Sequence, residues 1–212
     1  MTRPVIGIGT GRCGTVSLQK ILDGCHNAQV THEHENFRVK FHNSDRSPLK
    51  TLIGHCQSSS KYLRGEVASY WLPHIMSLRE AIPNLGVIAL KRQKKDTVQS
   101  FLQKCPGYSL VRQQDKPHNP MWFDLYPTLS SHLEIQESWE EYYDWYYSHV
   151  LNLSDVLIIQ TEGLNDSSTL ESIFDYLAIP KRHQHYPDRR IFNQIEETGI
   201  AYSKIIAKEQ DV

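Results

Sequence analysis

The sequence predicts an α/β fold in which a central parallel sheet lies between helices, giving a three-layer α/β/α architecture. Short continuous apolar runs at residues 5–8, 85–90 and 156–160 are typical of strands that are buried on both faces. Segments with helical spacing alternate with these runs, as in chains that form parallel sheets. The first run ends in glycines and opens directly into a helix, which is the start of a βα unit.

The remaining elements are expected in a regular alternation. Glycines, prolines and capping residues indicate where each one begins and ends. Further strands are expected at residues 28–31 and from residue 61 onward. The expected helices cover residues 15–22, 47–56, 73–80, 96–102, 132–151 and 168–177.

The length of the chain indicates a single domain over residues 1–212, and its composition limits the classes of function. The chain has 23 Lys and Arg residues against 24 Asp and Glu residues, a formal net charge of -1, which does not support nucleic-acid binding. The four cysteines lack zinc-type spacing. No apolar stretch has the length of a secretory leader or a membrane span, so a cytoplasmic protein is expected.

An irregular segment at residues 105–128 interrupts the pattern. Prolines and bulky residues accumulate there without any period. Such a segment in a compact domain is often a lid over a site. Its side chains Tyr108, Trp122 and Phe123 are therefore expected to bind an acceptor. The aromatic stripe of the helix expected at 132–151 is interpreted as core rather than as a ligand site.

The glycine-rich turn after the first strand is the first functional signal. It contains Gly11, Arg12, Cys13, Gly14, Thr15, Val16 and Ser17. Glycines let backbone N–H groups converge on an anion, the helix N-terminus adds a partial positive charge, and Arg12 adds a full one. A Walker loop would have a lysine and a magnesium-binding hydroxyl after its second glycine, but here Thr15 and Val16 follow Gly14. The turn therefore predicts an anion site that does not bind a magnesium nucleotide.

A second anion site is predicted where the apolar run 85–90 ends. Arg92 closes this strand, and Ser100 lies eight residues further on, inside the following helix. The guanidinium fork and the hydroxyl can converge on one phosphate. Two linked anion sites in this order are a more specific signal than either one.

Together, these two motifs resemble those of sulfotransferases that use 3'-phosphoadenosine 5'-phosphosulfate (PAPS). In that family the first turn holds the 5'-phosphosulfate, and an arginine with a later serine holds the 3'-phosphate. Val16 departs from the second threonine of many members. The resemblance implies a P-loop NTPase-like sulfotransferase fold, closer to the carbohydrate, tyrosylprotein and bacterial branches than to the cytosolic small-molecule branch. It also implies PAPS as donor, 3',5'-adenosine bisphosphate (PAP) as product, and no metal ion.

A polar run after the second expected strand is the expected source of a catalytic base. The resemblance implies Glu33 in this role, and the register leaves His34 and Glu35 open. Arg12 is expected to stabilise charge on the leaving phosphate, because a guanidinium keeps its proton. An alternative for this run is a metal site, since His32 and His34 would share one face of a strand.

Three further residues have weaker assignments. Glu66, at the expected exit of the third strand, is expected to position the acceptor, and Arg189 and Arg190 to close over the cofactor. The sequence thus predicts a metal-independent sulfotransferase that acts on a hydroxyl or amine of a small-molecule or carbohydrate acceptor. The alternatives are a non-catalytic adenosine-bisphosphate-binding protein and a degenerate P-loop kinase.

Overall fold

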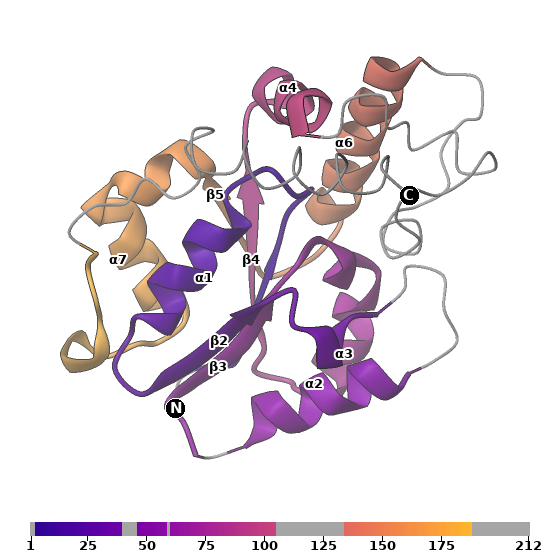
Figure 1. Ribbon diagram of the computed structural model, residues 1–212. Helices are drawn as coiled ribbons and strands as arrows, with labels where there is room; N and C mark the ends of the chain where they lie inside the picture. The colour runs from indigo at the N-terminus through magenta and orange to yellow at the C-terminus, as the bar shows by residue number, and fades with distance from the viewer. Residues whose placement is uncertain (1–2, 40–45, 59, 105–133, 188–212) are drawn as a thin grey trace, which may run out of the picture.

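A parallel sheet forms the centre of the molecule (Figure 1). The structure is a computed structural model that describes residues 3–39, 46–58, 60–104 and 134–187. Within these ranges the sheet has five strands in the order β2-β3-β1-β4-β5, and every neighbouring pair is parallel. The strands are β1 (Val5–Ile8), β2 (Ala28–His32), β3 (Leu63–Val67), β4 (Gly86–Lys91) and β5 (Val156–Gln160).

Helices connect the strands in the expected alternation. The α-helices are α1 (Thr15–Asp23), α2 (Ser47–Gln57), α3 (Ile75–Ala81), α4 (Lys94–Lys104), α6 (Ile135–Leu151) and α7 (Ser167–Tyr176). The 3-10 helices are η1 (Glu35–Phe37), η2 (Ser69–His74), η4 (Thr161–Asn165) and η5 (Lys181–His183). In the described part of the chain, no helix has both the length and the apolar character needed to cross a membrane.

Several element boundaries differ from the prediction by a few residues, and two helix starts illustrate this. Pro73 lies inside η2 instead of opening a helix, and α3 begins only at Ile75. The fixed φ of proline suits a 3-10 turn as well as a first α-helical turn, so the sequence alone does not separate the two. Helix α4 begins at Lys94, two residues before the expected position.

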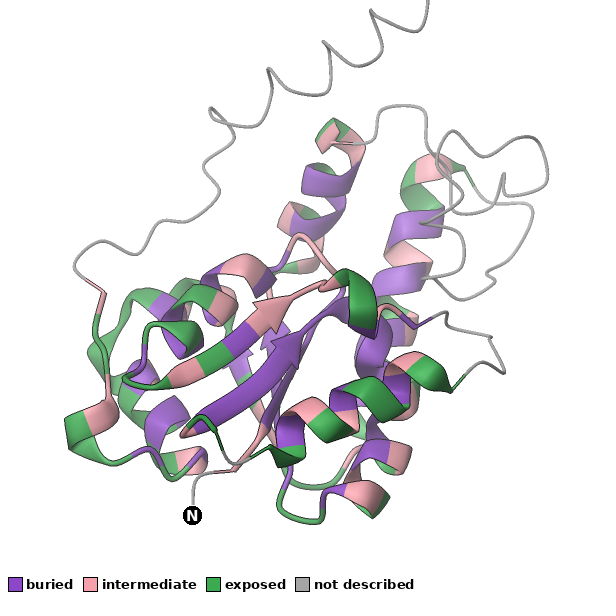
Figure 2. Ribbon diagram, turned by 60° about the horizontal axis from the view of Figure 1, so that its bottom comes forward, coloured by how far each residue is buried: buried purple, intermediate pink, exposed green. Residues whose placement is uncertain are grey.

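Two apolar clusters, one on each face of the sheet, form the core. Val5 belongs to the cluster that α1 and α7 cover, whereas Ile6 and Ile8 belong to the cluster that α2, α3 and α6 cover. This division follows from the alternation of side chains along a strand. Figure 2 shows the central strands as buried and the edge strand β2 as only partly covered. The predicted three-layer architecture is confirmed.

The strand order brings two distant turns to one edge of the sheet. Strand β1 lies between β3 and β4, and all three run in the same direction. The turn after β1 and the turn after β4 therefore leave side by side at the carboxyl edge. In open parallel sheets, ligands bind at this edge.

Candidate functional site

The turn between β1 and α1 has the backbone shape of an anion site. Gly11, Arg12 and Gly14 have positive φ angles of 82°, 55° and 87°. Gly14 is the N-cap of α1 and brings no side chain to the first N–H groups of the helix. These N–H groups have no acceptor within a helix, so they are available to an anion.

The two predicted anion-binding motifs contact each other. Arg12 Nε donates a hydrogen bond to Ser100 Oγ at 3.1 Å, and the Arg92 guanidinium donates to the carbonyl oxygen of Arg12 at 3.3 Å. The two arginines are half-buried and Ser100 is buried. The structure thus gathers two guanidinium groups and a hydroxyl beside the N-terminus of α1. A donor set of this kind suits a ligand with two phosphate groups.

Cys13 takes part in the turn through its backbone and not through its thiol. Its side chain is 0% exposed, and burial raises the pKa of the thiol to about 11. Thr161, at the start of η4, donates its hydroxyl to the carbonyl of Cys13 at 2.6 Å. Val16 is half-buried and Ser17 is buried in the first turn of α1. The Cys13 thiol is therefore part of the core and is not a nucleophile at neutral pH.

The end of β2 contacts the start of α1. His32 Nε2 lies 3.0 Å from Thr15 Oγ1. Burial lowers the pKa of His32 to about 4, so the ring is neutral near pH 7. His32 thereby links the polar run to the anion turn, a contact that sequence reasoning missed.

Glu33 follows β2 in a left-handed backbone conformation. Its φ is 48°, and its N–H donates to the carbonyl of Val67 at 3.3 Å. Burial raises the pKa of the Glu33 carboxyl, and the charge of Arg38 acts in the opposite direction. A carboxylate with a raised pKa is a suitable proton acceptor near neutral pH.

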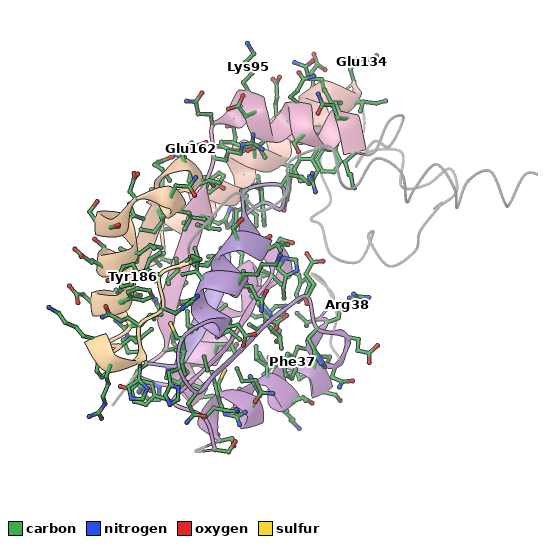
Figure 3. All side chains as sticks on the ribbon, turned by 60° about the vertical axis from the view of Figure 1, so that its left-hand side comes forward. Phe37, Arg38, Lys95, Glu134, Glu162 and Tyr186 are labelled. Atoms are coloured by element: carbon green, nitrogen blue, oxygen red, sulfur yellow. The ribbon has the colours of Figure 1, made fainter. Side chains whose placement is uncertain are left out.

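The other two candidates for the base have different surroundings. His34 Nδ1 accepts a hydrogen bond from the N–H of Asn36 at 3.3 Å, and its ring packs on Phe37 with a centroid distance of 4.9 Å. Glu35 is exposed in η1. Phe37 and its neighbour Arg38 lie at the end of this segment, beside α2 (Figure 3). Glu33 is the candidate that combines partial burial with a pKa raised by that burial.

Glu66 lies inside β3 and is 0% exposed, so its predicted position at the strand exit is wrong. Its Oε1 accepts from the N–H of His34 at 2.8 Å, and its Oε2 accepts from the hydroxyl of Thr31. Burial raises the pKa of Glu66 to about 7, and the charge of Glu33 adds to the rise. The carboxyl can be buried because each of its oxygens accepts a hydrogen bond, one from β2 and one from the turn that follows β2. Glu66 therefore supports this turn and presents no carboxyl oxygen to an acceptor.

Helix α6 contributes hydroxyl groups that sequence reasoning missed. Trp139 and its neighbours are buried, which confirms the predicted core role of the stripe. Four tyrosines of this helix also bind backbone carbonyls near the carboxyl edge of the sheet: Tyr142, Tyr143, Tyr146 and Tyr147. The available signal was chemical, since buried tyrosine hydroxyls need hydrogen-bond partners.

Several predicted site residues lie outside the described residues, and their roles stay predictions. They are Tyr108, Trp122 and Phe123 of the expected lid at 105–128, together with Arg189 and Arg190. Among the residues that are described, no group of three or more His, Cys, Asp or Glu side chains is arranged to hold a metal ion.

Comparison with known proteins identifies the fold. No protein-family model and no curated protein matches this chain. The crystal structure of a sulfotransferase from Alicyclobacillus acidocaldarius matches with a TM-score of 0.57 and 14% identity, over 98% of this chain and 94% of that chain. The chain has a sulfotransferase fold. A mouse sulfotransferase, SULT7A1 complexed with PAP, matches with a TM-score of 0.49 and 17% identity, over 98% of this chain and 64% of the mouse chain.

In this sulfotransferase fold, the two predicted anion-binding motifs lie at the carboxyl ends of β1 and β4. The turn after β1 supplies Arg12, and the β4–α4 unit supplies Arg92 and Ser100. The fold that the motifs implied is thus confirmed by the bacterial structure.

Proposed function

We propose that the protein is a sulfotransferase that uses PAPS and transfers its sulfuryl group to a hydroxyl or amine of a small-molecule or carbohydrate acceptor. The observation that carries this proposal is the contact of Arg12 with both Arg92 and Ser100. PAPS differs from common adenine nucleotides by its 3'-phosphate, so its site needs two groups of anion donors. The turn before α1 and the β4–α4 unit supply two such groups at one edge of the sheet.

In this proposal each group of donors binds one end of the nucleotide. The turn from Gly11 to Ser17 binds the 5'-phosphosulfate through backbone N–H groups, and Arg92 with Ser100 binds the 3'-phosphate. In-line sulfuryl transfer requires alignment and stabilisation of charge on the leaving phosphate. Arg12 serves the second need, because its guanidinium stays charged and the residue is only half-buried.

Glu33 is the proposed base for the acceptor. An acceptor hydroxyl must lose its proton as the bond to sulfur forms, and a carboxylate can accept it. Burial raises the pKa of Glu33 above its ordinary value and makes it a stronger base than an exposed glutamate. The proposed step uses this carboxylate and no metal ion.

Ligand binding tests the nucleotide part of the proposal. Thermal unfolding is followed with PAP, adenosine 5'-monophosphate (AMP), ADP and ATP, with and without magnesium. PAP should stabilise most strongly and without magnesium, by about 2.7 kcal/mol at a concentration 100 times its Kd. Arg92→Ala should reduce the effect of PAP to that of AMP. Magnesium-dependent stabilisation by ATP would indicate a degenerate P-loop kinase and contradict the proposal.

Transfer assays test the catalytic part. PAP release from PAPS is measured with a panel of hydroxyl and amine acceptors. Glu33→Gln should keep PAP binding and lose about 10²- to 10⁴-fold in transfer rate. Glu35→Gln tests the register, because an equal loss there would move the base by two residues. PAP binding without transfer to any acceptor would favour a non-catalytic binding protein.

A further inference from the structure

One part of the α6 tyrosine row fixes the turn after β1. Tyr142 Oη donates to the carbonyl oxygen of Thr10 at 3.1 Å, and the N–H of Gly9 donates to Tyr146 Oη at 3.0 Å. Both tyrosines are 0% exposed. Helix α6 therefore fixes the first two residues of the turn by two hydrogen bonds. One tyrosine hydroxyl donates to the turn and the other accepts from it, and both are shielded from water.

Another part of the row fixes the second anion-binding motif. Tyr143 Oη donates to the carbonyl oxygen of Arg92 at 2.6 Å. Arg92 in turn donates to the carbonyl of Arg12 at 3.3 Å, and Arg12 donates to Ser100 at 3.1 Å. Tyr143 thus begins a series of three hydrogen bonds that contains both ligands proposed for the 3'-phosphate.

Packing alone does not account for these hydroxyl groups. Phenylalanine would fill nearly the same volume, whereas a buried hydroxyl is favourable only when it has a partner. The partners of Tyr142 and Tyr143 are the carbonyls of Thr10 and Arg92, which follow β1 and β4, where pairing within the sheet has ended. Figure 1 shows α6 beside α4 and near the carboxyl end of β4, so one helix reaches both turns.

We propose that Tyr142 and Tyr143 are positioning residues of the nucleotide site, Tyr142 for the 5' end and Tyr143 for the 3'-phosphate. This inference rests on the proposed function and assigns each tyrosine to one end of the nucleotide. Tyr143 acts through Arg92, so loss of its hydroxyl should weaken the preference for a 3'-phosphate. Tyr142 acts through Thr10, so loss of its hydroxyl should lower the binding affinity for every nucleotide with a 5'-phosphate by a similar factor.

The test compares the Kd of PAP with that of AMP, which lacks the 3'-phosphate, by isothermal titration calorimetry. In Tyr143→Phe the preference for PAP should fall about three- to tenfold, which corresponds to one hydrogen bond. In Tyr142→Phe both affinities should fall by a similar factor, and the preference should stay. Each result supports the assignment of that tyrosine to its end of the nucleotide.

Tyr176→Phe is the matched control at the other end of β4. Tyr176 Oη donates to the carbonyl of Asp155 at 2.8 Å and accepts from the N–H of Val87 at 3.0 Å. Loss of this hydroxyl should lower thermal stability and leave both affinities unchanged. An equal loss of PAP preference in Tyr176→Phe would show a general loosening of the fold and overturn the proposal.

The outcomes separate this inference from the proposed function. An unchanged preference in Tyr143→Phe overturns the inference while the proposed function stands. Absence of PAP binding by the unsubstituted protein overturns both. If Tyr143→Phe does not fold, Tyr142→Phe decides: parallel losses for PAP and AMP support the inference, and unchanged affinities overturn it.

Discussion

Two shielded groups, His32 at the end of β2 and Glu66 in the neighbouring strand β3, have pKa values that are shifted in opposite directions. Burial raises the pKa of Glu66 from 4.5 to about 7 and lowers that of His32 from 6.5 to about 4. Folded Glu66 keeps a proton that the unfolded chain loses, so its contribution to stability falls as pH rises from 4.5 to 7. Unfolded His32 takes up a proton that the folded chain does not bind, so its contribution rises with pH from 4 to 6.5. Between pH 4.5 and 6.5 the two effects largely offset each other.

Glu66→Gln should remove one side of this balance. Relative to the unsubstituted protein, the free energy of unfolding should gain a slope of about +1.4 kcal/mol per pH unit between pH 4.5 and 6.5, the value for one proton. Glu33, whose pKa is also raised, stays in both proteins. Urea unfolding at several pH values measures the slope, and exposed Glu80 provides the control Glu80→Gln. An unchanged slope in Glu66→Gln would contradict the buried, protonated carboxyl.

Gly14 is required by backbone shape as well as by space. Its φ is 87°, and a Cβ atom there would lie 2.8 Å from Thr161 Cγ2. Gly14→Ala should therefore cost at least about 1–2 kcal/mol of stability, the penalty for a left-handed conformation. It should also weaken PAP binding, because the cap of α1 must shift.

Gly54 offers the matched control in α2. A Cβ atom there would meet nothing within 4 Å, so Gly54→Ala should stabilise the protein by about 0.5–1 kcal/mol. Urea unfolding compares the two alanine variants. Equal effects of the two substitutions would exclude a special backbone role for Gly14.

At the scale of elements, α4 takes its position from α6. The rings of Phe101 and Trp139 stack with a centroid distance of 4.0 Å and an interplanar angle of 4°, and both are buried. The ion pair between Lys94 and Asp144, at 2.7 Å, is exposed and adds little. Because Ser100 precedes Phe101 directly, the stack also sets the place of the proposed 3'-phosphate ligand.

Phe101→Leu should therefore affect stability and binding together. Loss of the stacked pair should cost about 1 kcal/mol of stability, and PAP affinity should fall as α4 shifts. The control is Phe174→Leu in α7, which also removes a buried ring, one with an edge contact to Tyr186. It should lower the melting temperature without changing PAP affinity in calorimetry. A loss of affinity in both variants would mean that α4 has no special link to the site.

At the scale of the whole molecule, the two ends of the parallel strands, here called the carboxyl edge and the amino edge of the sheet, differ in their contacts. The predicted anion donors lie at the carboxyl edge, whereas Arg3 connects segments of the chain at the amino edge. Its guanidinium donates to the carbonyl of Leu85 at 3.0 Å and pairs with Asp155 at 2.5 Å. Arg79 donates to the carbonyl of Asp155 at 2.6 Å. These contacts fasten β4 and β5 at the end that lies away from the candidate site.

PAP should consequently protect one edge of the sheet more than the other. Hydrogen exchange with short labelling times reports local opening rather than global unfolding. Saturating PAP should slow exchange in residues 9–18 and 92–101, which are separated in sequence and adjacent in the fold. Residues 84–87 and 153–157 should change little. Equal protection at both edges would contradict a nucleotide site at the carboxyl edge.

The sequence by itself determined the elements and the two short motifs that are predicted to bind anions. Apolar runs and helical spacing are local patterns, so they located β1, β4 and β5 and the helices between them to within a few residues. Arg12, Arg92 and Ser100 could be proposed as anion ligands because each motif lies within one βα unit and its spacing is short-range. The three-layer fold followed from the alternation of these units.

Only the tertiary structure decided which of these residues meet. The placing of β1 between β3 and β4 sets Arg12 against Arg92 and Ser100, and no local pattern encodes strand order. The burial of Glu66 and the partners of the α6 tyrosines depend on how distant elements pack on the sheet. A hydrogen-bond partner is fixed by three-dimensional distance and direction, whereas sequence periodicity records only which side of an element is buried.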